Sequence, residues 1–90
     1  MSAVRKRVVV RGRVQGVFFR DTLSRMAATR SVAGWVENRS DGAVEAVFEG
    51  EPDEVGAMLA LCREGPEGAD VEGVESSDED PEGLTGFDVR

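Results

Sequence analysis

The spacing of apolar residues changes repeatedly along this chain of 90 residues, and the order of the changes constrains the fold more than any other feature. Apolar residues at every second position predict strands over residues 4–14, 33–38 and 44–48. Apolar residues at intervals of three and four predict helices over residues 20–30 and 52–64. The turn signal between the second and third of these strands makes them a hairpin.

The last third of the chain carries weaker signals. They predict a strand over residues 71–75, an acidic loop over residues 76–83 and a short strand over residues 87–90. The complete order is βαββαβ, and we see no repeat or linker in residues 1–90, so we expect one domain. This order predicts an α+β fold of the ferredoxin-like type, with an antiparallel four-stranded sheet and both helices on one face. A short fifth strand results if the tail pairs separately.

The first predicted strand has one apolar face and one basic face. The basic face consists of alternate residues from 5 to 13, namely Arg5, Arg7, Val9, Arg11 and Arg13. Arginines on a strand face are usually solvated, so we expect this strip to contact water. Only Arg20, beyond the strand, and Arg13 nearby are well placed to contact a substrate.

Composition excludes several kinds of chemistry. Cys62 is the only cysteine and histidine is absent, so one chain cannot form a disulfide, a Cys–His zinc site or a histidine general base. We therefore expect no cofactor. The longest apolar stretches have four or five residues, far below the roughly 20 that span a bilayer, and residues 1–7 lack the apolar run of a signal peptide. We therefore expect a cytoplasmic protein with no membrane partner.

Charge is distributed unevenly along the chain. Residues 1–30 carry eight basic residues and one acid, whereas residues 31–90 carry three basic residues and seventeen acids, for a net charge of −7. An acidic protein with one basic strip disfavours nucleic-acid binding but can attract a small anion. Eighteen acids and a single lysine also resemble the composition of proteins from salt-loving organisms. A GC-rich genome that favours arginine codons explains the same composition equally well.

The segment between the first strand and the first helix carries the strongest functional signal, and its sequence is Gly-Arg-Val-Gln-Gly-Val-Phe-Phe-Arg over residues 12–20. Gly16 allows the backbone to curl so that successive N–H groups point inward and can bind an anion. The following helix adds the positive end of its dipole, and Arg20 adds a planar fork of donors that matches two phosphate oxygens. Spacing alone equally favours a bulge followed by a surface arginine that pairs with Asp21 or Asp41.

Residues 12–20 resemble the first motif of the acylphosphatase family, Gly-x-Val-Gln-Gly-Val-x-Phe-Arg, at every fixed position. Residues 34–45, Gly-Trp-Val-Glu-Asn-Arg-Ser-Asp-Gly-Ala-Val-Glu, resemble the second family motif. The resemblance extends from about residue 4 to residue 89 and implies the ferredoxin-like fold and the hydrolysis of acyl phosphates without a metal. It implies that Arg20 binds phosphate and that Asn38 positions the attacking water. It also implies a cradle made by the backbone amides of Gln15, Gly16, Val17, Phe18 and Phe19.

The missing histidine and metal cluster fit this reaction. An acyl phosphate leaves as a weakly basic carboxylate, and phosphoryl transfer usually passes through a loose transition state, so positioning and charge stabilisation can suffice. We expect a monomer that binds a small acyl phosphate, with inorganic phosphate or sulfate as competing ligands.

Each functional interpretation has a simpler alternative. Asparagine is frequent where a strand meets a turn, so Asn38 could serve the turn alone. Trp35 is expected to cover the sheet surface, and Cys62 lies on the apolar stripe of the second helix, where it is expected to be buried and inert. An RNA-binding module and a non-catalytic anion sensor are alternatives for the whole protein. The acidic composition argues against the first and the presence of Asn38 against the second.

Overall fold

Seven elements make up the computed structural model, which describes residues 2–90. The strands are β1 (Val4–Arg13), β2 (Ala33–Asn38), β3 (Val44–Gly50), β4 (Asp70–Glu79) and β5 (Phe87–Val89), and the helices are α1 (Phe19–Thr29) and α2 (Pro52–Glu64). The predicted helices and the first three predicted strands are confirmed to within two residues.

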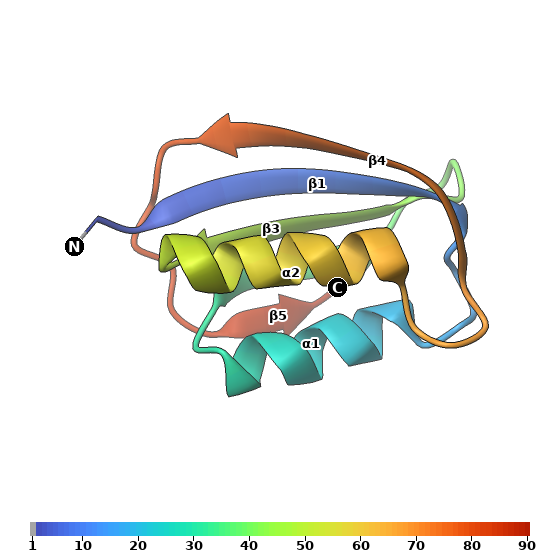
Figure 1. Ribbon diagram of the computed structural model, residues 1–90, viewed down its shortest axis with the longest axis horizontal. Coiled ribbons are helices and arrows are strands. Elements are labelled where there is room, and N and C mark those ends of the chain that lie inside the picture. Colours follow the sequence, from blue (N-terminus) through green and yellow to red (C-terminus); the bar gives the residue numbers. More distant parts are fainter. Residues whose placement is uncertain (1) are drawn as a thin grey trace.

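The five strands form one sheet in the order β4-β1-β3-β2-β5, and both helices cover the same face of it (Figure 1). Neighbouring strands are antiparallel, except that β5 runs parallel to β2, with Val36 paired with Val89. The predicted ferredoxin-like βαββαβ arrangement is therefore confirmed. The fifth strand exists and makes the sheet mixed, because the chain crosses from one sheet edge to the other between β4 and β5.

The expected acidic loop over residues 76–83 is wrong in its first half, because β4 continues to Glu79. β4 is an edge strand whose side chains are mostly exposed, so it lacks the alternation by which a strand is recognised. Its acidic side chains instead pair with the basic residues of β1. Lys6 contacts Asp78, and Arg5 and Arg7 each donate a hydrogen bond to Glu79.

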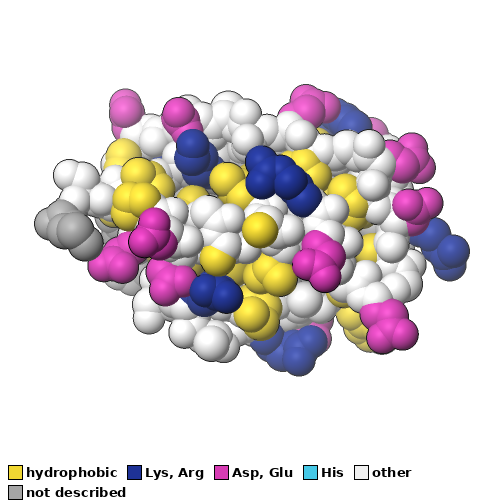
Figure 2. Space-filling view, in the orientation of Figure 1, with side chains coloured by type: hydrophobic (Ala, Val, Ile, Leu, Met, Phe, Trp, Pro, Cys, Tyr) yellow, Lys and Arg dark blue, Asp and Glu magenta, His cyan; other side chains and the backbone are white. Residues whose placement is uncertain are grey.

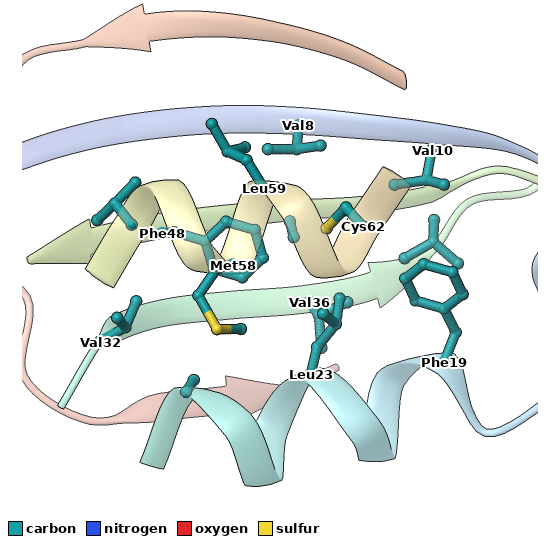
Figure 3. Packing of buried hydrophobic residues seen from close by; sticks show 14 of the residues in the cluster. Val8, Val10, Phe19, Leu23, Val32, Val36, Phe48, Met58, Leu59 and Cys62 are labelled. Carbon is teal, nitrogen blue, oxygen red and sulfur yellow. The ribbon is translucent and has the colours of Figure 1, made fainter. Parts of the chain in front are cut away.

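The core lies between the helices and the sheet (Figure 3). The helices bury seven side chains there, Phe19, Leu23 and Ala27 from α1 and Val55, Met58, Leu59 and Cys62 from α2. Each large apolar side chain stabilises the fold by roughly 1.5–3 kcal/mol when it leaves water. Burial also raises the pKa of the Cys62 thiol to about 12, so the reactive thiolate is scarce at neutral pH. The expectation that Cys62 is buried is confirmed.

On the opposite face of the sheet most arginines of β1 form ion pairs, and their exposure ranges from the buried Arg5 to the exposed Arg11 and Arg13. Arg5 is only 5% exposed and contacts Glu79 at 2.9 Å and Glu49 at 3.4 Å. The expectation of a solvated strip is therefore wrong for Arg5, because carboxylates on both neighbouring strands enclose its guanidinium. The guanidinium of Arg7, on β1, and that of Arg90, the residue after β5, lie over the Trp35 ring, at 5.5 and 4.3 Å from its centroid. Trp35 thus covers the sheet surface. Because the two arginines lie over its ring, the ring is not free to stack on a nucleic-acid base, as an RNA-binding module would require.

On the helix face, basic and acidic side chains are interspersed around apolar patches (Figure 2). The uneven distribution of charge along the sequence is therefore not reproduced as two separate regions on this face. Within residues 2–90 no helix is long and apolar enough to cross a membrane.

Candidate active site

The connection from β1 to α1, residues 14–18, turns sharply at two residues and is called the curl below. Gly16 has φ +73° and Phe18 has φ +61°, so both adopt left-handed backbone conformations. This conformation is natural for glycine but uncommon for a bulky side chain, and it turns the chain directly into the first turn of α1. The curl predicted at Gly16 is therefore present, and a second, unexpected one follows at Phe18.

The N-terminus of α1 is open toward this curl. Phe18 occupies the N-cap position and provides no side-chain cap, and the first helical hydrogen bond runs from the Thr22 N–H to the Phe18 carbonyl oxygen at 3.0 Å. The N–H groups at the start of a helix have no partner within the helix and carry the positive end of its dipole. An anion placed at this curl would therefore meet several donors at once.

Arg20 lies in the first turn of α1, half-buried, and its Nη1 donates a hydrogen bond of 2.6 Å to the main-chain oxygen of Arg90. Asp21 instead pairs with Arg25, and Asp41 pairs with Arg39 and Arg11. Neither carboxylate pairs with Arg20. The alternative of a surface arginine neutralised by Asp21 or Asp41 therefore does not describe this arrangement.

A cavity of about 530 Å³ brings the two sides of the site together. It is lined by residues from the curl, α1, β2 and β5, namely Val14, Gly16, Phe18, Phe19, Arg20, Asp21, Asn38 and Val89. Arg20 and Asn38 are 18 positions apart in the sequence and meet at this cavity. Gln15, Val17 and Arg13 do not line it; Val17 packs against the core instead.

The turn after Asn38 is built by other residues. The Ala43 N–H donates to Asp41 Oδ1 at 3.1 Å, and the Arg39 N–H donates to the Ala43 carbonyl oxygen at 2.8 Å. The Ala43 N–H is the main reason why the pKa of Asp41 is lowered, with Arg39 and Arg11 adding to the effect. Asn38 itself is the last residue of β2 and lines the cavity, so its position is explained better by the cavity than by the turn.

Comparison with known proteins identifies the family of this chain. The acylphosphatase family model matches residues 6–89, which is nearly the whole chain. The chain belongs to the acylphosphatase family. Curated acylphosphatases from Haloarcula marismortui and a Synechococcus species are 52% and 53% identical to it, over 100% and 97% of this chain and 99% and 93% of theirs. A solved acylphosphatase from Coxiella burnetii superimposes with a TM-score of 0.93 at 38% identity, covering 98% of this chain and 93% of that one.

One residue of this acylphosphatase family motif has a role that sequence reasoning missed. The Gln15 side chain does not line the cavity, and its Nε2 donates to the carbonyl oxygens of Arg39 and Ala43 at 2.7 and 2.9 Å. It thereby ties the curl that leads to Arg20 to the turn that follows Asn38. Only its fixed place in the motif could have singled it out, because the partners lie 24 and 28 residues further along.

Proposed function

We propose that this acylphosphatase hydrolyses small acyl phosphates by in-line attack of water that Asn38 positions, on a phosphate that Arg20 and the curl hold. The observation that carries the proposal is the single cavity lined by Gly16, Arg20 and Asn38. Hydrolysis of acyl phosphates is the reaction of the family to which the chain belongs. The parts played by individual residues are our proposal.

The phosphate end of the substrate would lie at the start of α1. Backbone N–H groups of residues 15–19, of which Gly16, Phe18 and Phe19 line the cavity, and the helix dipole would stabilise the negative charge of the equatorial oxygens. The guanidinium of Arg20 has five N–H donors and stays charged at any working pH, so the bond to the main-chain oxygen of Arg90 uses one donor and fixes the orientation of the fork. Arg20 can then donate two parallel hydrogen bonds to the phosphate.

The water would lie at the end of β2. The amide of Asn38 can accept a hydrogen bond from water through its oxygen while its NH₂ group faces the phosphate, so it aligns the attack without removing a proton. The leaving carboxylate needs no proton from an acid. These roles of Arg20 and Asn38 require neither a metal ion nor a histidine. Within residues 2–90, no three His, Cys, Asp or Glu side chains lie together so that they could hold a metal ion.

The first experiment incubates the purified protein with benzoyl phosphate or acetyl phosphate in excess chelator and follows phosphate release. We expect turnover that the chelator does not reduce, with inorganic phosphate and sulfate as competitive inhibitors. Loss of turnover in chelator would show that a metal is needed, and phosphate binding without turnover would favour an anion sensor.

The second experiment separates the water from the phosphate. Asn38→Ala should lower kcat by about 100-fold, as removal of a single oriented hydrogen-bonding group does in other enzymes, and leave the inhibition constant of phosphate nearly unchanged. Ser40→Ala, in the exposed turn two residues further on, is the matched control. If phosphate inhibition weakened as much as kcat fell, Asn38 would be a phosphate-binding residue instead. A monomeric state, a cytoplasmic location and the absence of nucleic-acid partners stay predictions.

A further inference from the structure

The cavity has an apolar side that the reaction itself does not use. Phe18 and Val89 are 80% and 49% exposed, and they are the exposed large hydrophobic residues found in residues 2–90. Both line the same cavity as Arg20 and Asn38. They come from opposite ends of the chain, because β5 pairs with β2 and brings Val89 beside Val36, two residues before Asn38.

Neither burial nor backbone preference explains a phenylalanine at position 18. The residue has φ 61° and ψ 25° and occupies the N-cap of α1. The left-handed conformation costs a bulky residue about 1–2 kcal/mol, and N-cap positions favour Asn, Asp, Ser, Thr or Gly. Asparagine or glycine would therefore suit this position better as far as folding is concerned. The exposed ring is explained by a contact that the folded chain does not make with itself.

The size of the cavity indicates what the Phe18 ring could contact. Its volume of about 530 Å³ falls within the range of about 300–1,000 Å³ typical of small-molecule sites and leaves room beyond a phosphate. Arg20 and Asn38 mark the phosphate end. An acyl phosphate also carries an acyl group, and the side chains of Phe18 and Val89 offer apolar surface to it in the same cavity.

We propose that Phe18 and Val89 bind the acyl group and make the site selective for acyl phosphates with an aromatic or branched apolar acyl group. This inference rests on the proposed function, because it needs the phosphate at Arg20. An aromatic acyl group can stack on or meet the edge of the Phe18 ring and lose apolar surface to Val89, whereas an acetyl group is too small to reach both.

The test compares kcat/KM for benzoyl phosphate and acetyl phosphate in the wild type and two variants. Phe18→Asn should lower the ratio of benzoyl to acetyl activity about tenfold, and Val89→Thr, which keeps the shape of the side chain, should lower it about threefold. Because asparagine suits the left-handed conformation, the thermal midpoint of Phe18→Asn should not fall. Inhibition by phenylphosphonate should weaken relative to inhibition by phosphate, which gives a readout that does not depend on turnover.

Ser31→Asn is the matched control. Within residues 2–90, Ser31 is the other non-glycine residue with positive φ, at 56°, and it lies beyond the opposite end of α1 and does not line the cavity. It should leave the ratio unchanged. An unchanged ratio in both Phe18→Asn and Val89→Thr would overturn the inference and leave the catalytic proposal intact. Activity of Arg20→Lys close to that of the wild type on both substrates would instead show that the proposed function of the site is wrong.

Discussion

Two regions of the molecule combine backbone N–H groups with an arginine, a combination that suits an anion. We call the region around Glu49 the filled region and the cavity at Arg20 the open region. In the connection from β4 to β5, the carboxylate of Glu49 accepts hydrogen bonds from the N–H groups of Glu82, Gly83 and Leu84 at 2.9, 2.8 and 2.9 Å. Arg5 contacts the same carboxylate at 3.4 Å. At the proposed site, Gly16 and Phe18 of the connection from β1 to α1 and Arg20 of α1 line an open cavity, and no side chain of residues 2–90 is bonded there as Glu49 is bonded to the N–H groups of residues 82–84.

The difference lies in where the anion comes from. Glu49 is 5% exposed, so the chain itself supplies the anion of the first region and thereby fastens the segment that leads into β5. Among the three residues whose N–H groups bind Glu49, the one with a left-handed conformation is a glycine, Gly83 with φ +76°. In the second region a phenylalanine takes such a conformation at position 18, and the substrate would supply the anion. On the function proposed above, the same donor chemistry stabilises the fold in one place and would bind a ligand in the other.

The largest expected effect comes from removing the arginine of the open region. Arg20→Lys keeps the charge but loses the planar fork, so we expect kcat/KM to fall by about 10³-fold, equivalent to about 4 kcal/mol of transition-state stabilisation. Circular dichroism should show an unchanged fold. Arg25→Lys, five residues further along α1 and exposed, is the matched control and should keep its activity. More than a tenth of wild-type activity in Arg20→Lys would defeat the assignment.

Emptying the filled region should affect stability rather than catalysis. Glu49→Ala leaves the N–H groups of residues 82–84 without their acceptor, while Arg5 keeps its pair with Glu79, so the free energy of unfolding should fall by about 3 kcal/mol in urea titrations, mainly through the unsatisfied donors. Glu75→Ala removes an exposed pair with Arg11 and should change it by less than about 1 kcal/mol. Added formate should restore part of the stability of Glu49→Ala by entering the vacated position. A loss no larger than that of Glu75→Ala would contradict this account.

The same region predicts a pH dependence. Burial alone would raise the pKa of the Glu49 carboxyl, but the N–H groups of residues 82–84 and Arg5 outweigh it and lower the pKa below its usual value. A lowered pKa in the folded state means that the stabilisation is present above the unfolded pKa, about 4.3, and is lost as pH falls below it. Urea titrations between pH 6 and pH 3 should therefore show a steeper loss in the wild type than in Glu49→Ala. Parallel curves would place the acid sensitivity elsewhere.

A smaller effect on activity should follow when the curl loses its hydrogen bonds to the turn after Asn38. Gln15→Ala removes two hydrogen bonds to the turn after Asn38, each contributing about 1 kcal/mol. We expect kcat/KM to fall about tenfold, because the curl and Asn38 lose their fixed relation. Thr29→Ala removes a side-chain hydrogen bond to the Arg25 carbonyl at the far end of α1 and should not change activity. Equal activities of the two variants would show that Gln15 does not position the site.

The sequence predicted those parts of the molecule that depend on local pattern. The helices follow from apolar spacing, and the curl at Gly16 and the place of Asn38 at the end of β2 follow from glycine, the turn signal and the two motifs. What it missed depends on pairing between distant strands. The length of β4, the burial of Arg5 and the arrival of Val89 at the cavity all follow from register, which a largely polar edge strand and a three-residue strand do not reveal by themselves.

The smallest expected effect concerns salt, which acts on both regions at once. Repulsion among the acids of residues 31–90 opposes the compact state at low ionic strength, and about 1 M salt shortens the Debye length to roughly 3 Å. Pairs such as those of Glu45 and Glu79 with Arg7 already neutralise part of this charge, so the gain should be modest. We expect the thermal midpoint to rise by roughly 5 °C, or about 1 kcal/mol, between low salt and 2 M KCl.

The open region should respond to the same salt in the opposite sense. Chloride and potassium ions screen the attraction between the arginine-containing cavity and a charged substrate, so KM for benzoyl phosphate should rise while the thermal midpoint rises. Salt should not displace the carboxylate of the filled region, because it belongs to Glu49, a buried side chain of the protein itself. A midpoint that stays flat or falls over this range would remove the hypothesis of salt adaptation. It would leave the GC-rich genome as the explanation of the composition and would not touch the roles proposed for Arg20 and Asn38.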